Sequence, residues 1–229
     1  MRKLLGIVVV ILLVFGLGGT AAAAEPTTVY LINTLDRVVV DVYVDGNLII
    51  EDFAPDTIRG PFVGEANGEL WIEMIPANTV LGEPNQYLTN AVLVTSLPAG
   101  QTVAIVAQRN NIPGAMGTLT MFAYDLARTG SGQARLMVHN ALVDDDIEVT
   151  FFPGTANEQV FSAGEGFHFQ TSLPAGSTTA SLILWGRDPA PEVIGTFTAD
   201  LQPGKLYVVF IYRKLSGIQV LRQEFNVGQ

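Results

Sequence analysis

Apolar and polar residues alternate along most of this chain with the two-residue period of a β-strand. In the segment Val40–Val44 the valines fall on one side, and Asp41 and Tyr43 fall on the other. This is the pattern of a strand with one buried face in an antiparallel sheet. Asp45-Gly46 follows directly and is typical of a tight hairpin turn, because glycine tolerates the positive φ that such a turn requires. No segment after the first 26 residues has a helical pattern, so the sequence predicts an all-β protein.

A similar order of features returns in the second part of the chain. Residues 135–139 resemble residues 28–32 as an opening strand, and residues 147–151 resemble residues 40–44. Each part has about seven or eight short strands in about 100 residues, which is the size and spacing of an immunoglobulin-like sandwich. A sheet with one apolar face needs a second sheet to cover it. We therefore expect two tandem immunoglobulin-like antiparallel β-sandwich domains, and a single β-barrel over both parts is the alternative.

The two domains are expected at residues 25–128 and 133–229. Residues 129–132 between them read Thr-Gly-Ser-Gly, which is the composition of a short flexible linker. The chain has no cysteine, so the disulfide of an immunoglobulin domain is absent. We expect Trp71 and Trp185 to anchor the two cores by packing instead.

The first 24 residues have the features of an export signal. Arg2 and Lys3 precede an apolar run that ends at Leu17, and Ala22 and Ala24 stand where a signal peptidase requires small side chains. We expect a signal peptide over residues 1–24 and a secreted, periplasmic or cell-surface protein with no membrane span after cleavage. An uncleaved amino-terminal anchor is the alternative.

Composition excludes several classes of function. Without cysteine there is no zinc ribbon, thiolate-bound iron–sulfur cluster or cysteine nucleophile, and two histidines cannot supply a three-histidine metal site. Removal of the first 24 residues leaves 10 Lys and Arg against 22 Asp and Glu, a net charge of −12. Affinity for nucleic acid depends on neutralising phosphates, so this charge has the wrong sign for nucleic acid as a partner.

The segment Val40–Gly46 reads VDVYVDG and closely resembles the signature of a bacterial and archaeal family called domain of unknown function 4397. In that family the stretch VHASPDAP precedes the signature. Here Val138–Ala141 stands in the corresponding place of the second part, and Asn33 stands where the histidine would fall in the first. The family turn LPAG recurs at Leu97–Gly100 and Leu173–Gly176. The resemblance implies an exported all-β module, often repeated in cell-surface proteins, with no established activity or catalytic residues.

Acidic residues are densest just before the second copy of the signature. On an extended strand Asp144, Asp146 and Glu148 would share a face, and three carboxylates on one face could hold a calcium ion. The run lacks the glycine and the alternating pattern of an EF-hand loop. The alternative is a solvated loop that leads into a strand.

Both histidines lie on expected strands. His139 is expected to order a neighbouring loop by hydrogen bonding, and Asn33 to do the same in the first part, with a role as base or ligand as the alternative for His139. His168 alternates with Phe167 and Phe169 and is expected to be an exposed or lightly buried strand residue. No serine has the Gly-x-Ser-x-Gly context of a nucleophile elbow, and no other cofactor is indicated.

Exposed tyrosines are the clearest candidates for binding. Tyr43 should face solvent if the valines beside it point inward, and Tyr30 and Tyr87 are further candidates. Tyrosines on a sheet can stack on sugars or anchor a protein. We therefore expect an exported, non-catalytic module for binding, adhesion or scaffolding, with a protein or glycan partner outside the cytoplasm. The alternatives are an extracellular hydrolase with a site in the groove between the domains, and a calcium-dependent surface module.

Overall fold

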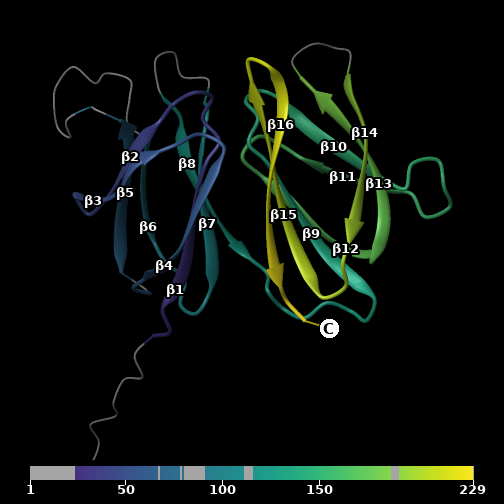
Figure 1. The fold of residues 1–229 in the computed structure, drawn as a ribbon, viewed down its shortest axis with the longest axis horizontal. Helices are drawn as coiled ribbons and strands as arrows, with labels where there is room; N and C mark the ends of the chain where they lie inside the picture. Colours follow the sequence, from purple (N-terminus) through teal and green to yellow (C-terminus); the bar gives the residue numbers. More distant parts are fainter. Residues whose placement is uncertain are drawn as a thin grey trace, which may run out of the picture.

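A computed structural model of the chain describes residues 24–66, 68–77, 79, 91–110, 116–186 and 191–228. In these ranges the chain forms β-strands and turns, with no helix (Figure 1), and the prediction of an all-β protein is confirmed. No helix of sufficient length and apolarity to cross a bilayer occurs in the part of the chain that is described. The expected signal peptide, up to residue 23, lies outside the described residues.

The first half contains eight strands: β1 (Thr27–Asn33), β2 (Val40–Val44), β3 (Asn47–Phe53), β4 (Thr57–Gly64), β5 (Glu69–Pro76), β6 (Ala91–Ser96), β7 (Thr102–Gln108) and β8 (Thr118–Tyr124). The second half contains eight more: β9 (Gln133–Asn140), β10 (Asp146–Phe151), β11 (Gln159–Ala163), β12 (His168–Pro174), β13 (Gly176–Trp185), β14 (Glu192–Leu201), β15 (Lys205–Lys214) and β16 (Gly217–Asn226).

Each half is built from two four-stranded sheets. The first half has the orders β4-β1-β7-β8 and β3-β2-β5-β6, and the second has β12-β9-β15-β16 and β11-β10-β13-β14. The strand order is therefore the same in both halves. One pair in each half is parallel, β1 with β7 and β9 with β15, which corrects the expectation of purely antiparallel sheets. These partners are far apart in sequence, and the chain between them crosses to the opposite sheet, so both can run in the same direction.

The hairpin predicted at Asp45-Gly46 is confirmed. These two residues join β2 to β3, and both have positive φ, 49° and 77°, as a two-residue primed turn requires. The valines of β2 point inward as expected, since Val40 and Val42 are fully buried.

Each half encloses its own core, so the single-barrel alternative is wrong. The first core lies between the first two sheets and includes Val29, Leu31, Val40, Val42, Phe53, Ile72, Met74 and Ile105. The second includes Leu136, Val138, Ile147, Val149, Phe151, Leu182, Leu184 and Tyr207.

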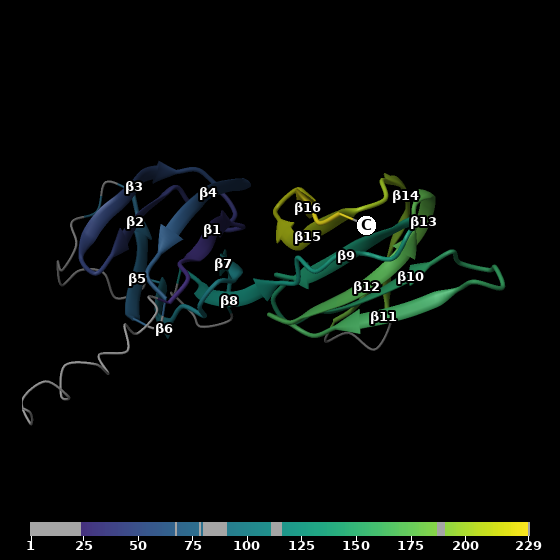
Figure 2. The same ribbon diagram turned by 90° about the horizontal axis from the view of Figure 1, so that it is seen from below.

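A third apolar cluster joins the halves across the sheets β4-β1-β7-β8 and β12-β9-β15-β16, which lie next to each other in Figure 2. Its buried members are Ile32, Ala104, Val106, Phe122, Tyr124, Met137, Leu206, Val208, Phe210 and Val227. Because side chains alternate across a strand, β1 and β7 send one face into their own core and the other into this junction. Asp56 adds polar contacts there, since it accepts a hydrogen bond from Tyr212 Oη (2.7 Å) and pairs with Lys214 Nζ.

The segment expected to be a flexible linker is held on both sides. Thr129 is buried and its hydroxyl donates to the carbonyl of Gly228 at 3.0 Å. The guanidinium of Arg135 donates to the carbonyls of Asp125 and Ala127, each at 2.8 Å. The connection between the halves is therefore fixed by hydrogen bonds, while the exact boundaries at residues 25–128 and 133–229 stay a prediction.

The expected anchors of the two cores lie on the outside. Trp71 is 49% exposed and Trp185 is 46% exposed, so the prediction that they anchor the cores is wrong. In β5 and β13 the neighbouring Ile72 and Leu184 point inward, and alternation along the strand then turns both tryptophans outward.

Two buried asparagines fix how the halves correspond. Asn33 Nδ2 donates to the carbonyls of Val38 (3.1 Å) and Phe53 (3.0 Å). Asn140 makes the same pair of bonds to Asp145 (2.8 Å) and Ala163 (3.0 Å). Each asparagine also accepts a hydrogen bond at 3.0 Å from the backbone N–H two residues later. Asn33 therefore matches Asn140.

The expected match of Asn33 with His139 is wrong by one residue. With the asparagines aligned, the fully buried Val40 of β2 and Ile147 of β10 each follow seven residues later, and no gap is needed between the two parts. His139 takes the position that Ile32 has in the first half, where the side chain points into the junction between the halves.

Candidate ligand pocket

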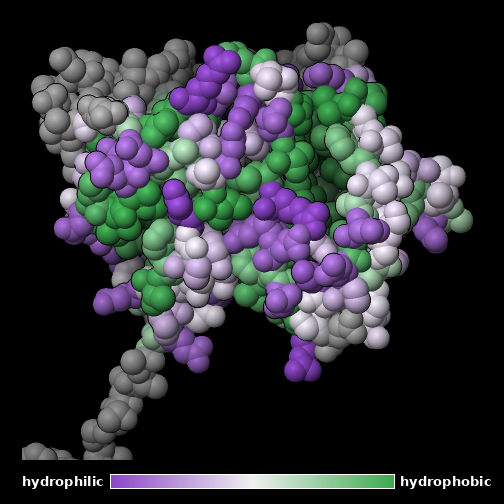
Figure 3. All heavy atoms as spheres, viewed as in Figure 1, coloured by the Kyte–Doolittle hydropathy of each residue, from purple (hydrophilic) through white to green (hydrophobic). Residues whose placement is uncertain are grey.

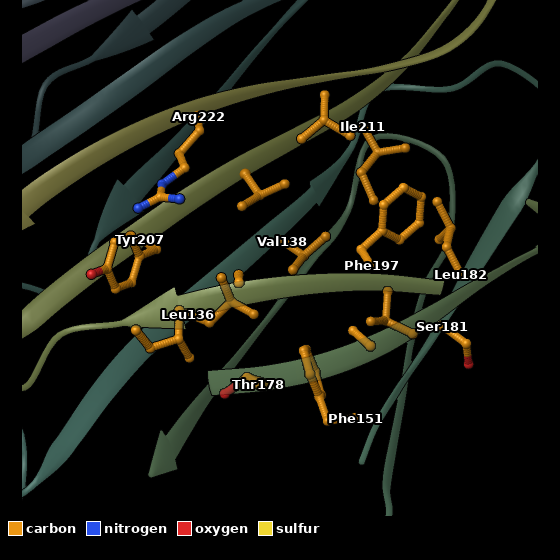
Figure 4. Close-up of a pocket in the computed structure, with 16 residues that line it drawn as sticks. Leu136, Val138, Phe151, Thr178, Ser181, Leu182, Phe197, Tyr207, Ile211 and Arg222 are labelled. Atoms are coloured by element: carbon orange, nitrogen blue, oxygen red, sulfur yellow. The ribbon is translucent and has the colours of Figure 1, made fainter. Parts of the chain in front are cut away.

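A cavity of about 370 Å³ opens into the core of the second half, between its two sheets (Figure 4). Its volume falls within the range of small-molecule sites. Its walls are largely apolar and include Leu136, Val138, Phe151, Leu182, Phe197 and Ile211. These side chains come from β9, β10, β13, β14 and β15, so both sheets contribute to the site.

Small residues on β13 create part of this space. Val42 pairs with Met74 in the first half, and Val149 pairs with Leu182 in the second. Counting along the strands from these pairs places Ala180 at the position of Ile72, and Thr178 at that of Leu70. At these two positions the first half therefore has branched aliphatic side chains, and the second half has a methyl group and a hydroxyl. The first half has a cavity of about 390 Å³ of its own, which Leu70 and Ile72 border together with residues of β1 to β4.

A third difference lies on the last strand of each half. In the first half Ile105 pairs with Met121, and Met121 packs against the core. In the second half the matching pair is Val209 with Arg222. A charged side chain therefore replaces a methionine on the face that looks into the sandwich.

The cavity opens along the edge between β14 and β16. In the first half the matching edge strands, β6 and β8, lie close together, and β14 and β16 do not approach each other to the same extent. Phe197 and Val220 line the cavity from these strands, yet each is about half exposed. Figure 3 shows a hollow with apolar walls at this edge of the second half.

Charged groups gather beside one end of the cavity. The guanidinium of Arg222 lies over the ring of Tyr207, 4.4 Å from its centroid. Arg222 pairs with Glu224, and Lys205 Nζ pairs with the other carboxylate oxygen of Glu224 at 3.2 Å. Desolvation acts to raise the pKa of Glu224, but hydrogen bonds from Lys205 and Arg222 hold it below its ordinary value. Two cations thus share one carboxylate.

One buried hydroxyl on the cavity wall lacks a hydrogen-bond partner. Thr178 is 4% exposed, and among the described residues nothing bonds to its Oγ1. A buried polar atom without a partner costs about 1–3 kcal/mol. A ligand with a polar atom at this end of the cavity would remove that cost.

Of the tyrosines expected to bind ligand, Tyr43 is half-buried on the outer face of the first half. It pairs across the sheet with Leu48 and Glu73. Exposed apolar residues surround it on this face: Leu48, Trp71, Val92 and Val94. We call these four residues and Tyr43 the outer patch.

The other two tyrosines are placed differently. The Tyr30 ring packs in the junction, 5.4 Å from Phe225 and 6.3 Å from Tyr124 between ring centroids, so it is not presented on a free sheet face. Tyr87 lies outside the described residues.

The acidic run does not form a metal site in the part of the chain that is described. No group of three or more His, Asp or Glu side chains there has an arrangement suited to a metal ion. Asp144 lies in a turn with φ of 63°, whereas Asp146 and Glu148 lie on β10. The change of backbone direction at Asp144 separates its side chain from the face that the other two share. Asp145 instead pairs with Arg213 at 2.9 Å.

His139 is completely buried in the junction between the halves. Its Nε2 lies 3.2 Å from Gln108 Oε1, and its ring stacks on Phe122 with 4.6 Å between centroids. Burial, with a smaller contribution from the charge of His168, lowers the pKa of His139 to about 3. The side chain therefore ties the two halves together and is neutral near pH 7. His168 is exposed, as expected.

A smaller cavity of about 240 Å³ lies between the loops of the two halves. Its walls include Thr34 and Arg109 from the first half and Asp144 and Arg213 from the second. Asp144 is the only acidic or histidine side chain on its described walls, where it lies with Arg109 and Arg213.

Thr178, Tyr207 and Arg222 were not among the site residues expected from the sequence. Their signal becomes visible only when the two halves are compared strand by strand in the observed pairing. Thr178, Tyr207 and Arg222 then take the positions of Leu70, Val103 and Met121 of the first half.

No protein-family model and no curated protein matches this chain, and the resemblance to domain of unknown function 4397 stays a prediction. Among solved structures, a candidate cell adhesion protein from Bacteroides uniformis has 10% sequence identity, covers 90% of this chain and 97% of its own, and superposes with a TM-score of 0.29. A candidate cell adhesion protein from Parabacteroides distasonis has 11% identity, covers 90% and 98%, and has a TM-score of 0.28. Scores this low carry no argument about function.

Proposed function

We propose that this chain is an exported, non-catalytic binding protein whose second sandwich holds an apolar ligand between its sheets. The observation that carries the proposal is the cavity of about 370 Å³ with largely apolar walls. A core of this kind normally closes by packing at the density of an organic crystal. Here Ala180 and Thr178 stand on the cavity wall where the first half has the larger Ile72 and Leu70.

Export of the chain rests on its first 24 residues, which have the basic start, apolar run and small residues of a signal peptide. The absence of cysteine is compatible with a secreted fold held by packing. A non-catalytic role is supported by the burial of His139, because a fully buried imidazole cannot reach a substrate.

A second role in adhesion is favoured by the outer patch of the first half. Trp71, Val94 and Leu48 are each about half exposed on the same face as Tyr43. Exposed aromatic and aliphatic side chains on a flat sheet suit contact with a protein surface or a sugar ring. We assign this patch to a macromolecular partner outside the cytoplasm.

The pocket is tested with a neutral apolar fluorophore, N-phenyl-1-naphthylamine, added to residues 25–229. We expect saturable binding to the unchanged chain and loss of binding in the double variant Thr178→Leu with Ala180→Ile, which installs the side chains of the first half. The control is Thr196→Leu with Thr198→Ile, because both threonines are exposed on the opposite face of β14. Equal binding to all three proteins would refute the site, and so would no binding to any of them.

A further inference from the structure

The cavity of the second half is polar at one end and apolar at the other. Figure 4 shows Arg222, Tyr207 and Thr178 toward one end, and Ile211, Phe197 and Leu182 toward the opposite end. The strand register agrees, because Thr178 pairs with Ala199 near the end of β14, and the turn that follows leads directly into β15. The hydroxyl of Tyr207 accepts a hydrogen bond from the backbone of Gln202 in this turn at 2.8 Å.

The polar end is positively charged on an acidic protein. Lys205 and Arg222 provide two positive charges against the single carboxylate of Glu224, while the whole chain has a net charge of −10. An anion is therefore attracted to this end and repelled by most of the remaining surface.

Arg222 has hydrogen-bonding capacity left for such an anion. A guanidinium has five N–H donors in a planar fork, and Glu224 accepts from only Nη2. Stacking on Tyr207 holds the guanidinium at the cavity mouth. At the same position Met121 simply closes the first core, so packing alone does not require a charge there.

A cavity with apolar walls and positive charges at its mouth suits a ligand that has an apolar chain and a negatively charged head group. We propose, building on the proposed function, that the second sandwich binds a single-chain aliphatic carboxylate. The chain lies between the sheets against Leu182, Phe197 and Ile211, and the carboxylate pairs with Arg222 at the mouth. The hydroxyl of Thr178, which has no partner among the described residues, lies toward the same end and donates to an oxygen of the ligand.

Three probes with the same alkyl chain and different head groups test the assignment: dodecanoate, dodecanol and dodecyltrimethylammonium. Each displaces N-phenyl-1-naphthylamine from residues 25–229 at pH 8, below its micelle concentration. Charge-assisted hydrogen bonds to a carboxylate are roughly twice as strong as neutral ones, so we expect dodecanoate to bind at least tenfold more tightly than dodecanol. The cationic probe should bind most weakly.

Two charge variants locate the carboxylate. Arg222→Met installs the side chain of the first half. It should weaken dodecanoate binding by about tenfold or more and change dodecanol binding much less, because only the carboxylate loses a charged partner. Arg59→Met removes the same charge from an exposed position on β4 and should change neither affinity.

The two proposals fail in different ways. Equal affinity for dodecanoate and dodecanol, or an equal loss in both arginine variants, would overturn the assignment of the carboxylate to Arg222 and leave the apolar pocket standing. Failure of the fluorophore and of all three probes to bind would overturn the proposed function itself.

Discussion

Filling the second core with the residues of the first should stabilise the ligand-free protein. The perturbation is the double variant Thr178→Leu with Ala180→Ile. Ala180 lines the cavity and Thr178 has an unpartnered hydroxyl on its wall. The variant therefore adds apolar groups where there is space, and removes a buried polar atom that has no hydrogen bond.

The magnitude follows from these two changes. Ala180→Ile adds three carbons, each contributing about 0.8 kcal/mol when buried, and loss of the unpartnered hydroxyl contributes about 1–3 kcal/mol. Strain from imperfect packing reduces this gain in stability by about 1–3 kcal/mol. We expect a net gain of about 2 kcal/mol in the free energy of unfolding, which corresponds to a rise in Tm of about 4–8 °C for a chain of this size.

The assay is thermal and urea unfolding of protein freed of bound lipid, with Thr196→Leu and Thr198→Ile as the control pair on the outer face of β14. The control pair should lie within about 0.5 kcal/mol of the unchanged chain, because these side chains remain exposed. A destabilised Thr178→Leu/Ala180→Ile variant would show that Ala180 and Thr178 do not border usable space, and would refute the account of the cavity.

Two further predictions concern the asparagines and the buried histidine. Asn33→Ala and Asn140→Ala should each lower the free energy of unfolding by about 3 kcal/mol, since each leaves buried backbone groups without a partner. Urea unfolding measures this loss, with the exposed Asn47→Ala as the control. A loss no larger than that of the control would contradict the prediction. His139 has a pKa of about 3 when folded, against an ordinary value of 6.5. Above pH 6.5 the imidazole is neutral in both the folded and the unfolded chain, and its contribution to stability is complete. As the pH falls from 6.5 toward 3, the unfolded chain takes up a proton that the folded chain does not. The free energy of unfolding then decreases with a slope of at most about 1.4 kcal/mol per pH unit. His139→Gln should reduce this slope in unfolding measured across that range, and an unchanged slope would show that His139 does not take up the proton on unfolding.

Local features of the fold could be predicted from the sequence because their causes are local. The valine alternation of Val40–Val44 and the Asp45-Gly46 turn specify a strand and a hairpin without reference to the rest of the chain. The facing of Trp71 and Trp185 could not be obtained in this way. A large aromatic residue is compatible with either face of a strand, and only the neighbours Ile72 and Leu184 decide which face is covered.

The junction between the halves has a signal in the sequence. Residues 103–107 and 206–212 are apolar on both faces of their strands, and such runs are typical of strands covered on both sides. Each therefore needs a second covering layer beyond its own sandwich.

The pocket could not be predicted from either half alone, because Ala180 and Thr178 are ordinary strand residues. It depends on a comparison of β5 with β13, whose register is set by the strand pairs Val42–Met74 and Val149–Leu182. The sequence alone contains no signal for these long-range pairs, so the contrast between Leu70 and Thr178 could not be seen in it.

The junction also determines how the protein can respond to force. Ile32, Phe122 and Phe210 are buried between the sandwiches, and Asp56 is held by Tyr212 and Lys214. A force applied at the outer patch would therefore be resisted by the junction before the halves could separate. The two halves are therefore held in one arrangement, which would keep the proposed pocket and the outer patch at a constant separation. Either half produced alone would expose a sheet that normally faces its neighbour, and would self-associate through it.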